Sequence, residues 1–161
     1  MINMIIQKAI EYDKGDAKRI NHFVKVYTYA KLIGELEELD KNQQQILEIA
    51  AVLHDIGIHE SERKYNSSAG SYQQLEGPPI AENILNSLNI SQEIIKRVCY
   101  LISHHHTYTN ITEDDYQILV EADFIVNIYE DDLSRKQIES IKEKIFRTKS
   151  GTEILCNIFN L

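Results

Sequence analysis

The chain has 161 residues, enough for one domain with a substantial core, and its 43% hydrophobic and 26% charged residues are typical of a globular protein. A net charge of −8 argues against a duplex nucleic-acid-binding protein, which needs a basic face, but not against a small nucleotide ligand whose charge a metal can offset. The low content of 6 Gly and 2 Pro favours long helices over many tight turns.

Apolar periodicity predicts an all-α fold, a single-domain bundle of about seven helices over residues 1–161. No linker, internal repeat or low-complexity tract divides the chain. We expect a motif-bearing core over about residues 17–130, with C-terminal helical segments over 134–161 packed on it. The expected helices cover residues 1–13, 17–39, 42–54, Gly77-Pro78-Pro79 to about 88, 91–104, 116–126 and the segment from 134 to the break at 148–151.

Residues 58–77 show no sustained periodicity, because a charged stretch, 60–64, is followed by small polar residues, 66–71. We interpret this segment as a long loop. A loop of this length in a compact domain is either a lid over a site or a mobile surface excursion.

The two cysteines, Cys99 and Cys156, lie far apart among apolar residues, a pattern that favours buried, reduced thiols over a disulfide. The start of the chain is apolar for only a few residues and lacks the features of a secretory signal. No apolar run reaches membrane-spanning length, so we expect a cytoplasmic protein without a membrane partner.

Side chains that can ligate a metal interrupt the apolar faces of four expected helices. His22 shares an inward row with Val26 and Ile33. Asp123 lies on an apolar stripe, where a lone carboxylate must be paired, protonated or bound to a metal. The other two helices end in adjacent donors, His54-Asp55 in one and His104-His105-His106 in the other.

Each of these residues alone fits an ordinary role, as a hydrogen-bonded core histidine or a capping pair. Together they predict a metal site between facing helices, and the mixture of nitrogen and oxygen donors suits a first-row transition ion. Gly57 follows the His54-Asp55 pair, and we expect it to adopt the positive φ that often ends a helix.

This ordered pattern resembles the HD superfamily of metal-dependent phosphohydrolases, over roughly residues 17–130. The resemblance implies that one divalent ion is bound by His22, by the His54-Asp55 doublet, and by Asp123 as the final aspartate. It implies a divalent transition metal, such as iron or manganese, as the cofactor.

Two-metal members of the family carry further histidines, which His104 and His105 resemble; His106 is the less clear member of this cluster. A further family histidine precedes the glycine that opens the next helix, but this chain has Glu76 there. Glu76 either ligates a second ion or orients a histidine, so the resemblance leaves one or two ions open and favours two.

The resemblance implies hydrolysis of a small phosphate ester, a nucleotide or a related phosphate, by metal-activated water. We assign catalytic roles to Asp55 as the ligand that contacts water, to His104 or His105 as the acid for the leaving group, and to Arg19 as a phosphate clamp. Lys64 and His59 are interpreted as surface residues.

Two other functions stay open, a di-iron oxygenase of the same fold and a non-catalytic metal- or nucleotide-binding module. We expect a small phosphorylated partner, no duplex nucleic acid and no membrane, and a homodimer is compatible with the sequence.

Overall fold

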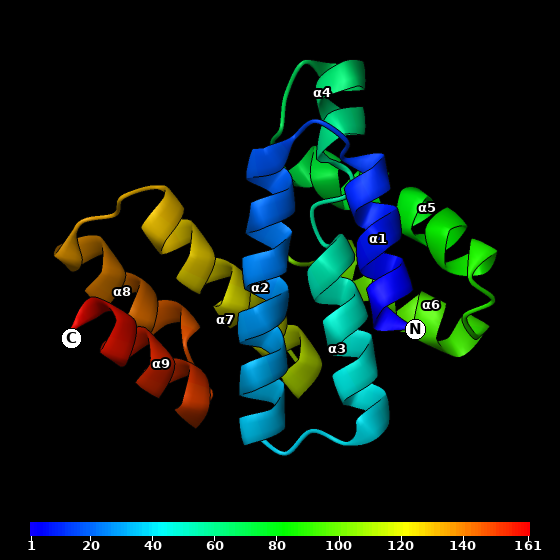
Figure 1. Ribbon diagram of the computed structural model, residues 1–161. Coiled ribbons are helices and arrows are strands. Elements are labelled where there is room, and N and C mark those ends of the chain that lie inside the picture. The colour runs from blue at the N-terminus through cyan, green and yellow to red at the C-terminus, as the bar shows by residue number, and fades with distance from the viewer.

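The computed structural model describes all residues, 1–161, and consists of 9 α-helices without a strand (Figure 1). The all-α prediction is confirmed, but the expected number of about seven helices is too low. The helices are α1 Ile2–Tyr12, α2 Ala17–Leu36, α3 Lys41–Leu53, α4 Ile58–Tyr65, α5 Gly70–Ser87, α6 Gln92–Ile102, α7 Asp114–Glu130, α8 Arg135–Ile145 and α9 Lys149–Phe159.

The segment interpreted as a long loop contains α4 and the first two turns of α5. Periodicity did not reveal α4 because it buries only Ile58 and Ser61 and is otherwise polar. Its support is local instead: the Ser61 hydroxyl donates to the Gly57 carbonyl at 2.8 Å, and Asn66 ends the helix with a left-handed φ of 51°. Pro78 and Pro79 therefore lie inside α5 and do not open it.

The second additional helix is α9, which covers most of the expected C-terminal tail. It begins at Thr148, whose side chain accepts from the Gly151 amide, and it buries Leu155. It packs on α7 and α2, beside α8 (Figure 1).

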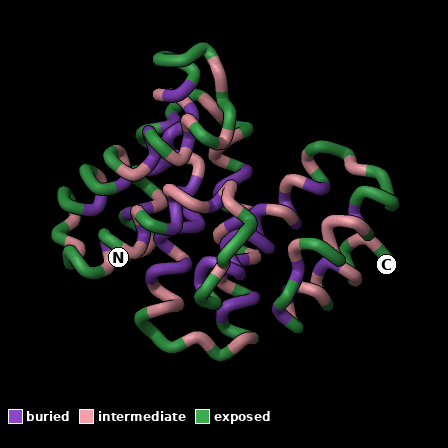
Figure 2. The backbone as a smooth tube through the Cα atoms, turned by 180° about the vertical axis from the view of Figure 1, so that it is seen from behind, coloured by how far each residue is buried: buried purple, intermediate pink, exposed green.

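The centre of the bundle is formed by α2, α3 and α7, which pack against one another and carry most of the buried residues (Figure 2). One hydrophobic cluster of 31 buried residues runs through them. α6 packs against α3, and α5 covers α6, so the end of α6 is brought to the end of α3. This packing places the ends of helices that are distant in sequence next to one another.

A buried carboxylate, Glu121 of α7, fixes the C-terminal pair of helices. Its Oε1 accepts from the backbone amides of Arg147 and Thr148, at 2.7 and 2.9 Å, and from Gln117 Nε2 at 2.7 Å. Its other oxygen accepts from the Thr148 hydroxyl. These four donors explain how a fully buried acid is tolerated there.

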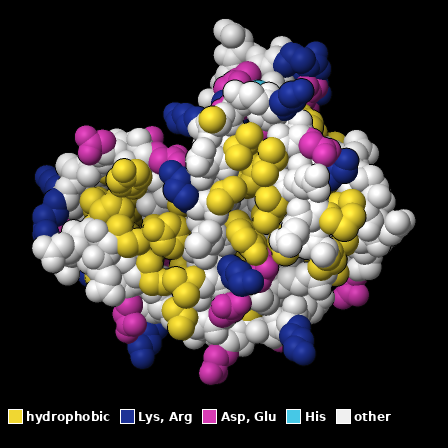
Figure 3. Space-filling view, in the orientation of Figure 1, with side chains coloured by type: hydrophobic (Ala, Val, Ile, Leu, Met, Phe, Trp, Pro, Cys, Tyr) yellow, Lys and Arg dark blue, Asp and Glu magenta, His cyan; other side chains and the backbone are white.

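Cys99 and Cys156 are free, as expected, but each is half-buried where full burial was predicted. No helix combines the length and the apolar character needed to cross a membrane. On the face drawn in Figure 3, exposed hydrophobic side chains gather between α1 and α2 and over the C-terminal helices, and almost no histidine surface is visible. The histidines at positions 22, 54 and 105 are indeed buried.

Candidate metal centre

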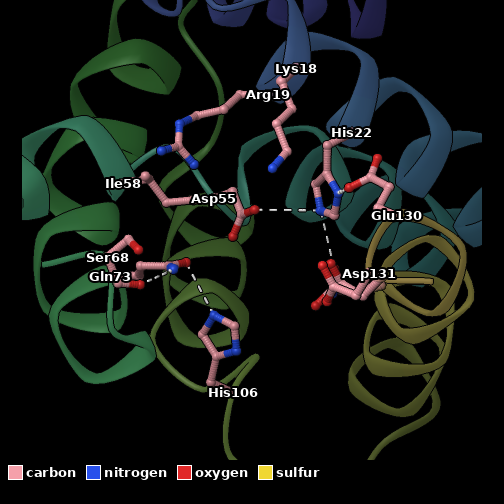
Figure 4. A pocket seen from close by; sticks show the side chains of 12 residues that line it. Lys18, Arg19, His22, Asp55, Ile58, Ser68, Gln73, His106, Glu130 and Asp131 are labelled. Atoms are coloured by element: carbon pink, nitrogen blue, oxygen red, sulfur yellow. Dashed lines mark hydrogen bonds and ion pairs between the residues drawn. The ribbon is translucent and has the colours of Figure 1, made fainter. Parts of the chain in front are cut away.

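Three helices bring four of the expected ligands together. His22 projects from α2 and Asp123 from α7, while His54 and Asp55 occupy the turn that follows α3. The His22 Nε2 atom lies 3.2 Å from both His54 Nε2 and Asp123 Oδ1, and 3.4 Å from Asp55 Oδ2. Figure 4 shows Asp55 facing the ring of His22.

Gly57 places this turn by close packing and not by a positive φ, since its φ is −80°. A Cβ atom at this position would lie 2.5 Å from the backbone nitrogen of Gly77 in α5. The expectation of a left-handed conformation is therefore wrong. The glycine is needed because the backbones of the turn and of α5 touch, which sets where Asp55 lies.

The outer nitrogens of the histidines determine which atoms face the centre. His54 Nδ1 lies 2.9 Å from the Ala51 carbonyl, which can only accept, so Nδ1 must donate. His22 Nδ1 lies 2.8 Å from the Glu130 carboxylate and donates likewise. In their neutral forms both rings therefore turn Nε2 lone pairs toward each other and toward two carboxylates. Such an arrangement needs a cation or a proton at its centre.

The electrostatics show the same demand for positive charge. Burial lowers the pKa of His54, but the charge of Asp55 and a hydrogen bond to Asp123 more than offset this and raise it to about 9. The pKa of His22 is also raised, since the same carboxylates outweigh the effect of burial. Burial would raise the pKa of Asp123, yet its hydrogen bonds to both histidines hold it well below the usual value. The centre thus keeps its carboxylates ionised and attracts positive charge.

A second donor group adjoins the first. It comprises Asp55, His105 and His106, whose ligand atoms lie within 4.8 Å of one another. His105 Nδ1 donates to the Ile102 carbonyl at 2.7 Å, so its Nε2 carries a lone pair, 3.4 Å from Asp55 Oδ1. This Nε2 atom is buried and has no hydrogen-bond partner. An orphaned buried acceptor beside a carboxylate is the environment expected of a metal ligand.

His106 joins this group although the sequence left its role unclear. Its Nε2 lies 3.1 Å from Gln73 Oε1, and the Gln73 amide nitrogen donates to the Ser68 carbonyl, so Oε1 accepts from His106. Burial lowers the pKa of His106 to about 4, which keeps the ring neutral at pH 7.

The structure does not bring His104 or Glu76 to the centre. The His104 ring stacks on Tyr100 at a centroid distance of 4.2 Å, and its Nδ1 bonds the Tyr100 carbonyl. Glu76 accepts from Lys64 Nζ and Tyr65 Oη, each at 2.7 Å. Neighbouring residues at a helix end point about 100° apart, so His104 and His105 face different sides.

Arg19 lines the pocket, but carboxylates already hold its guanidinium. Its Nη2 lies 2.6 Å from Glu62 and its Nε 3.0 Å from Asp16. His59 lies apart from the centre, 3.3 Å from Asp16, and Lys64 pairs with Glu76.

Two supporting residues of α7 were missed in the sequence. Asn127 Nδ2 donates to Asp123 Oδ1 at 2.8 Å, and Glu130 accepts from His22 and, at 2.6 Å, from Lys25. They follow Asp123 by four and seven residues, one and two helical turns further along the same face. This spacing was the available signal.

The centre opens into a pocket of about 340 Å³, lined by 12 side chains of which only Ile58 is hydrophobic (Figure 4). It includes Asp55, Asp123 and His106 from the two donor groups. Reactive groups at its base are therefore accessible from solvent.

A family model for the HD domain matches residues 19–146, a range that contains every donor of both groups. The chain belongs to the HD domain family. The crystal structure of a predicted HD superfamily hydrolase from an uncultured Thermotogales bacterium resembles this HD domain with a TM-score of 0.66 and 23% identity. The alignment covers 99% of this chain and 83% of that chain, and it shows a shared fold. Among curated proteins, none matches the chain.

The donors of this HD domain fit a divalent metal. Imidazole nitrogens and carboxylate oxygens converge, their outer atoms are held by hydrogen bonds, and one buried acceptor has no other partner. The same chemistry accommodates several first-row ions.

Proposed function

We propose that this HD domain is a metal-dependent phosphohydrolase that cleaves a small phosphate ester. The position of Asp55 carries the proposal. One of its oxygens lies 3.4 Å from His22 in the first donor group, and the other lies 3.4 Å from His105 in the second. A carboxylate between two donor groups is the arrangement that allows two ions to act on one phosphate.

The proposed ligands divide into two sets that share Asp55. The first comprises His22, His54, Asp55 and Asp123, and the second comprises Asp55, His105 and His106. His104 and Glu76 are left out of both sets, since their side chains have other partners. Two ions agree with this division, and one ion would occupy the first set.

When bound, a divalent ion lowers the pKa of a coordinated water to about 7 and neutralises charge on phosphoryl oxygens. The chain contributes orientation. Asp55 is held ionised, because the charge of His54 outweighs the effect of burial and keeps its pKa low. It can therefore accept a hydrogen bond from the attacking water. Glu130 and the Ala51 carbonyl fix the rings of His22 and His54.

The test is hydrolysis of p-nitrophenyl phosphate by metal-loaded protein, with Asp55→Ala as the variant. Loss of this carboxylate disrupts both donor sets, so we expect metal-dependent hydrolysis to disappear while the helical circular dichroism is retained. Metal content per chain, measured on the same samples, separates one ion from two. Hydrolysis at the wild-type rate in Asp55→Ala would contradict the proposal.

Oxygen uptake by iron-loaded protein is the second measurement, because histidine-rich donor sets also suit iron. Oxygen uptake without phosphate release would indicate that the protein is an oxygenase and not a hydrolase. Metal binding without turnover of any ester would indicate a binding module.

A further inference from the structure

The wall of the pocket above the metal centre is unusually polar for a small-molecule site. Such sites are ordinarily lined by hydrophobic and aromatic side chains, whereas Ile58 is the single hydrophobic residue here. No Tyr or Phe lines the pocket. The nearby aromatic rings are engaged elsewhere: Tyr65 stacks on Tyr72 at 4.1 Å and Tyr108 packs on Phe124 at 5.1 Å. A nucleobase would find no Tyr, Phe or Trp ring to stack on in this wall.

Four side chains of the wall, called here the rim groups, retain free polar atoms. Neither Lys18 Nζ nor the Asp131 carboxylate has an ion pair or hydrogen bond, and the same is true of the Ser68 hydroxyl and Asn127 Oδ1. Of the other polar residues, Arg19 forms ion pairs with two carboxylates, and Glu130 holds His22 and Lys25. The rim groups are thus free to form hydrogen bonds with a bound molecule.

These atoms surround the pocket. Lys18 comes from α2, Ser68 from the segment before α5, and Asp131 from the end of α7, and Figure 4 shows the three on different sides of the pocket. The rim offers acceptors, an ammonium donor and a hydroxyl that does both. This mixture matches alcohol groups, each of which donates one hydrogen bond and accepts others.

The charge of the rim also bears on the ligand. The negative charge of Asp131 offsets the positive charge of Lys18, and Arg19 is already paired with carboxylates. The wall therefore has no two unpaired cationic side chains that could bind additional phosphate groups. A leaving group with additional phosphates would meet Asp131 and Glu130. An uncharged leaving group avoids this repulsion.

We propose that the substrate is the phosphate ester of a polyhydroxylated alcohol, a sugar or polyol phosphate, with its hydroxyls bound by the rim groups. This rests on the proposed function for the position of the phosphate at the metal centre. Of the two substrate classes expected from the sequence, a nucleotide or a related phosphate, it selects a related phosphate without a base.

Binding to metal-loaded wild-type protein tests this independently of turnover. Calorimetric titration compares a panel of hexose, pentose and polyol phosphates with the four common nucleoside 5′-monophosphates. We expect at least one sugar or polyol phosphate to bind about tenfold more tightly than every nucleotide. Tighter binding of a nucleotide would overturn the substrate class. Hydrolysis of p-nitrophenyl phosphate is measured separately, so failure of the enzymatic proposal is distinguished from failure of this one.

The rim is tested with Asp131→Asn and Ser68→Ala. Ser68→Ala removes a hydrogen bond to a hydroxyl, and Asp131→Asn replaces a charged acceptor by a weaker neutral one. Each is expected to weaken binding of the preferred sugar phosphate about fivefold, while inorganic phosphate, which lacks the alcohol, loses much less. Asp132→Asn is the matched control, because it removes the same charge from an exposed neighbour that does not line the pocket. Equal losses in Asp131→Asn and Asp132→Asn would overturn the role of the rim.

Discussion

Glu130→Gln tests how the protein prepares His22 to bind a metal. The carboxylate of Glu130 accepts from two donors, His22 Nδ1 at 2.8 Å and Lys25 Nζ at 2.6 Å, one at each oxygen. Glutamine keeps the shape but has one oxygen and one NH₂ group. It can therefore satisfy one donor while its NH₂ group faces the other.

The loss of metal affinity in Glu130→Gln depends on which way the glutamine amide turns. If its oxygen faces His22, the Nδ1–H form is kept, but the ring loses the negative charge that strengthens it as a ligand. If its NH₂ faces His22, Nδ1 must accept, and the proton moves to Nε2, the atom that faces the centre. We expect metal affinity to fall between about 10-fold and about 100-fold, or about 1.4 to 2.8 kcal/mol.

The assay is a competition titration of Mn²⁺ against a chromophoric chelator, with circular dichroism as a check on folding. Glu48→Gln is the control, because Glu48 is 13% exposed against 15% for Glu130 and is also hydrogen-bonded, but it lies away from the centre. We expect the control to bind Mn²⁺ as the wild type does. Unchanged affinity in folded Glu130→Gln would refute the argument from the tautomer.

Three further predictions concern stability. Burial raises the pKa of Asp13 to about 6, so the stability that this carboxyl contributes below about pH 4 is lost as the pH rises through 6. Asp13→Asn should therefore stabilise the protein by about 1–2 kcal/mol at pH 8, allowing for solvent screening, and hardly at pH 3.5, and equal urea midpoint shifts at both pH values would contradict this. Glu121→Gln turns an NH₂ group toward the donors around Thr148, so the free energy of unfolding measured in urea should fall by about 2–4 kcal/mol. An unchanged urea midpoint would be inconsistent with the role of the carboxylate. Gly57→Ala forces the turn away from Gly77, so we expect a lower melting temperature and weaker Mn²⁺ binding, and wild-type values for both would show that the backbones need not touch.

Local patterns in the sequence were sufficient for the class of fold and for the types of side chain at the candidate metal centre. Long helices follow from apolar residues at helical spacing, and this spacing is a property of each segment alone. The buried positions of His22 and Asp123 follow in the same way, since both interrupt apolar rows. The apolar spacing did not predict α4, because this helix is stabilised by local ion pairs and caps and not by an apolar face.

The partners of the ligands were decided only by the tertiary structure. Glu130 and His22 are 108 residues apart and meet because α2 and α7 pack side by side. Sequence could not distinguish His105 from His104 at the end of α6, since the two side chains point about 100° apart and the apolar pattern does not fix which of them faces Asp55. Helix periodicity defines a face to within a wide arc, whereas a ligand must be placed to a fraction of an ångström. That accuracy comes from contacts between helices, such as the approach of Gly57 to Gly77, which no single segment encodes.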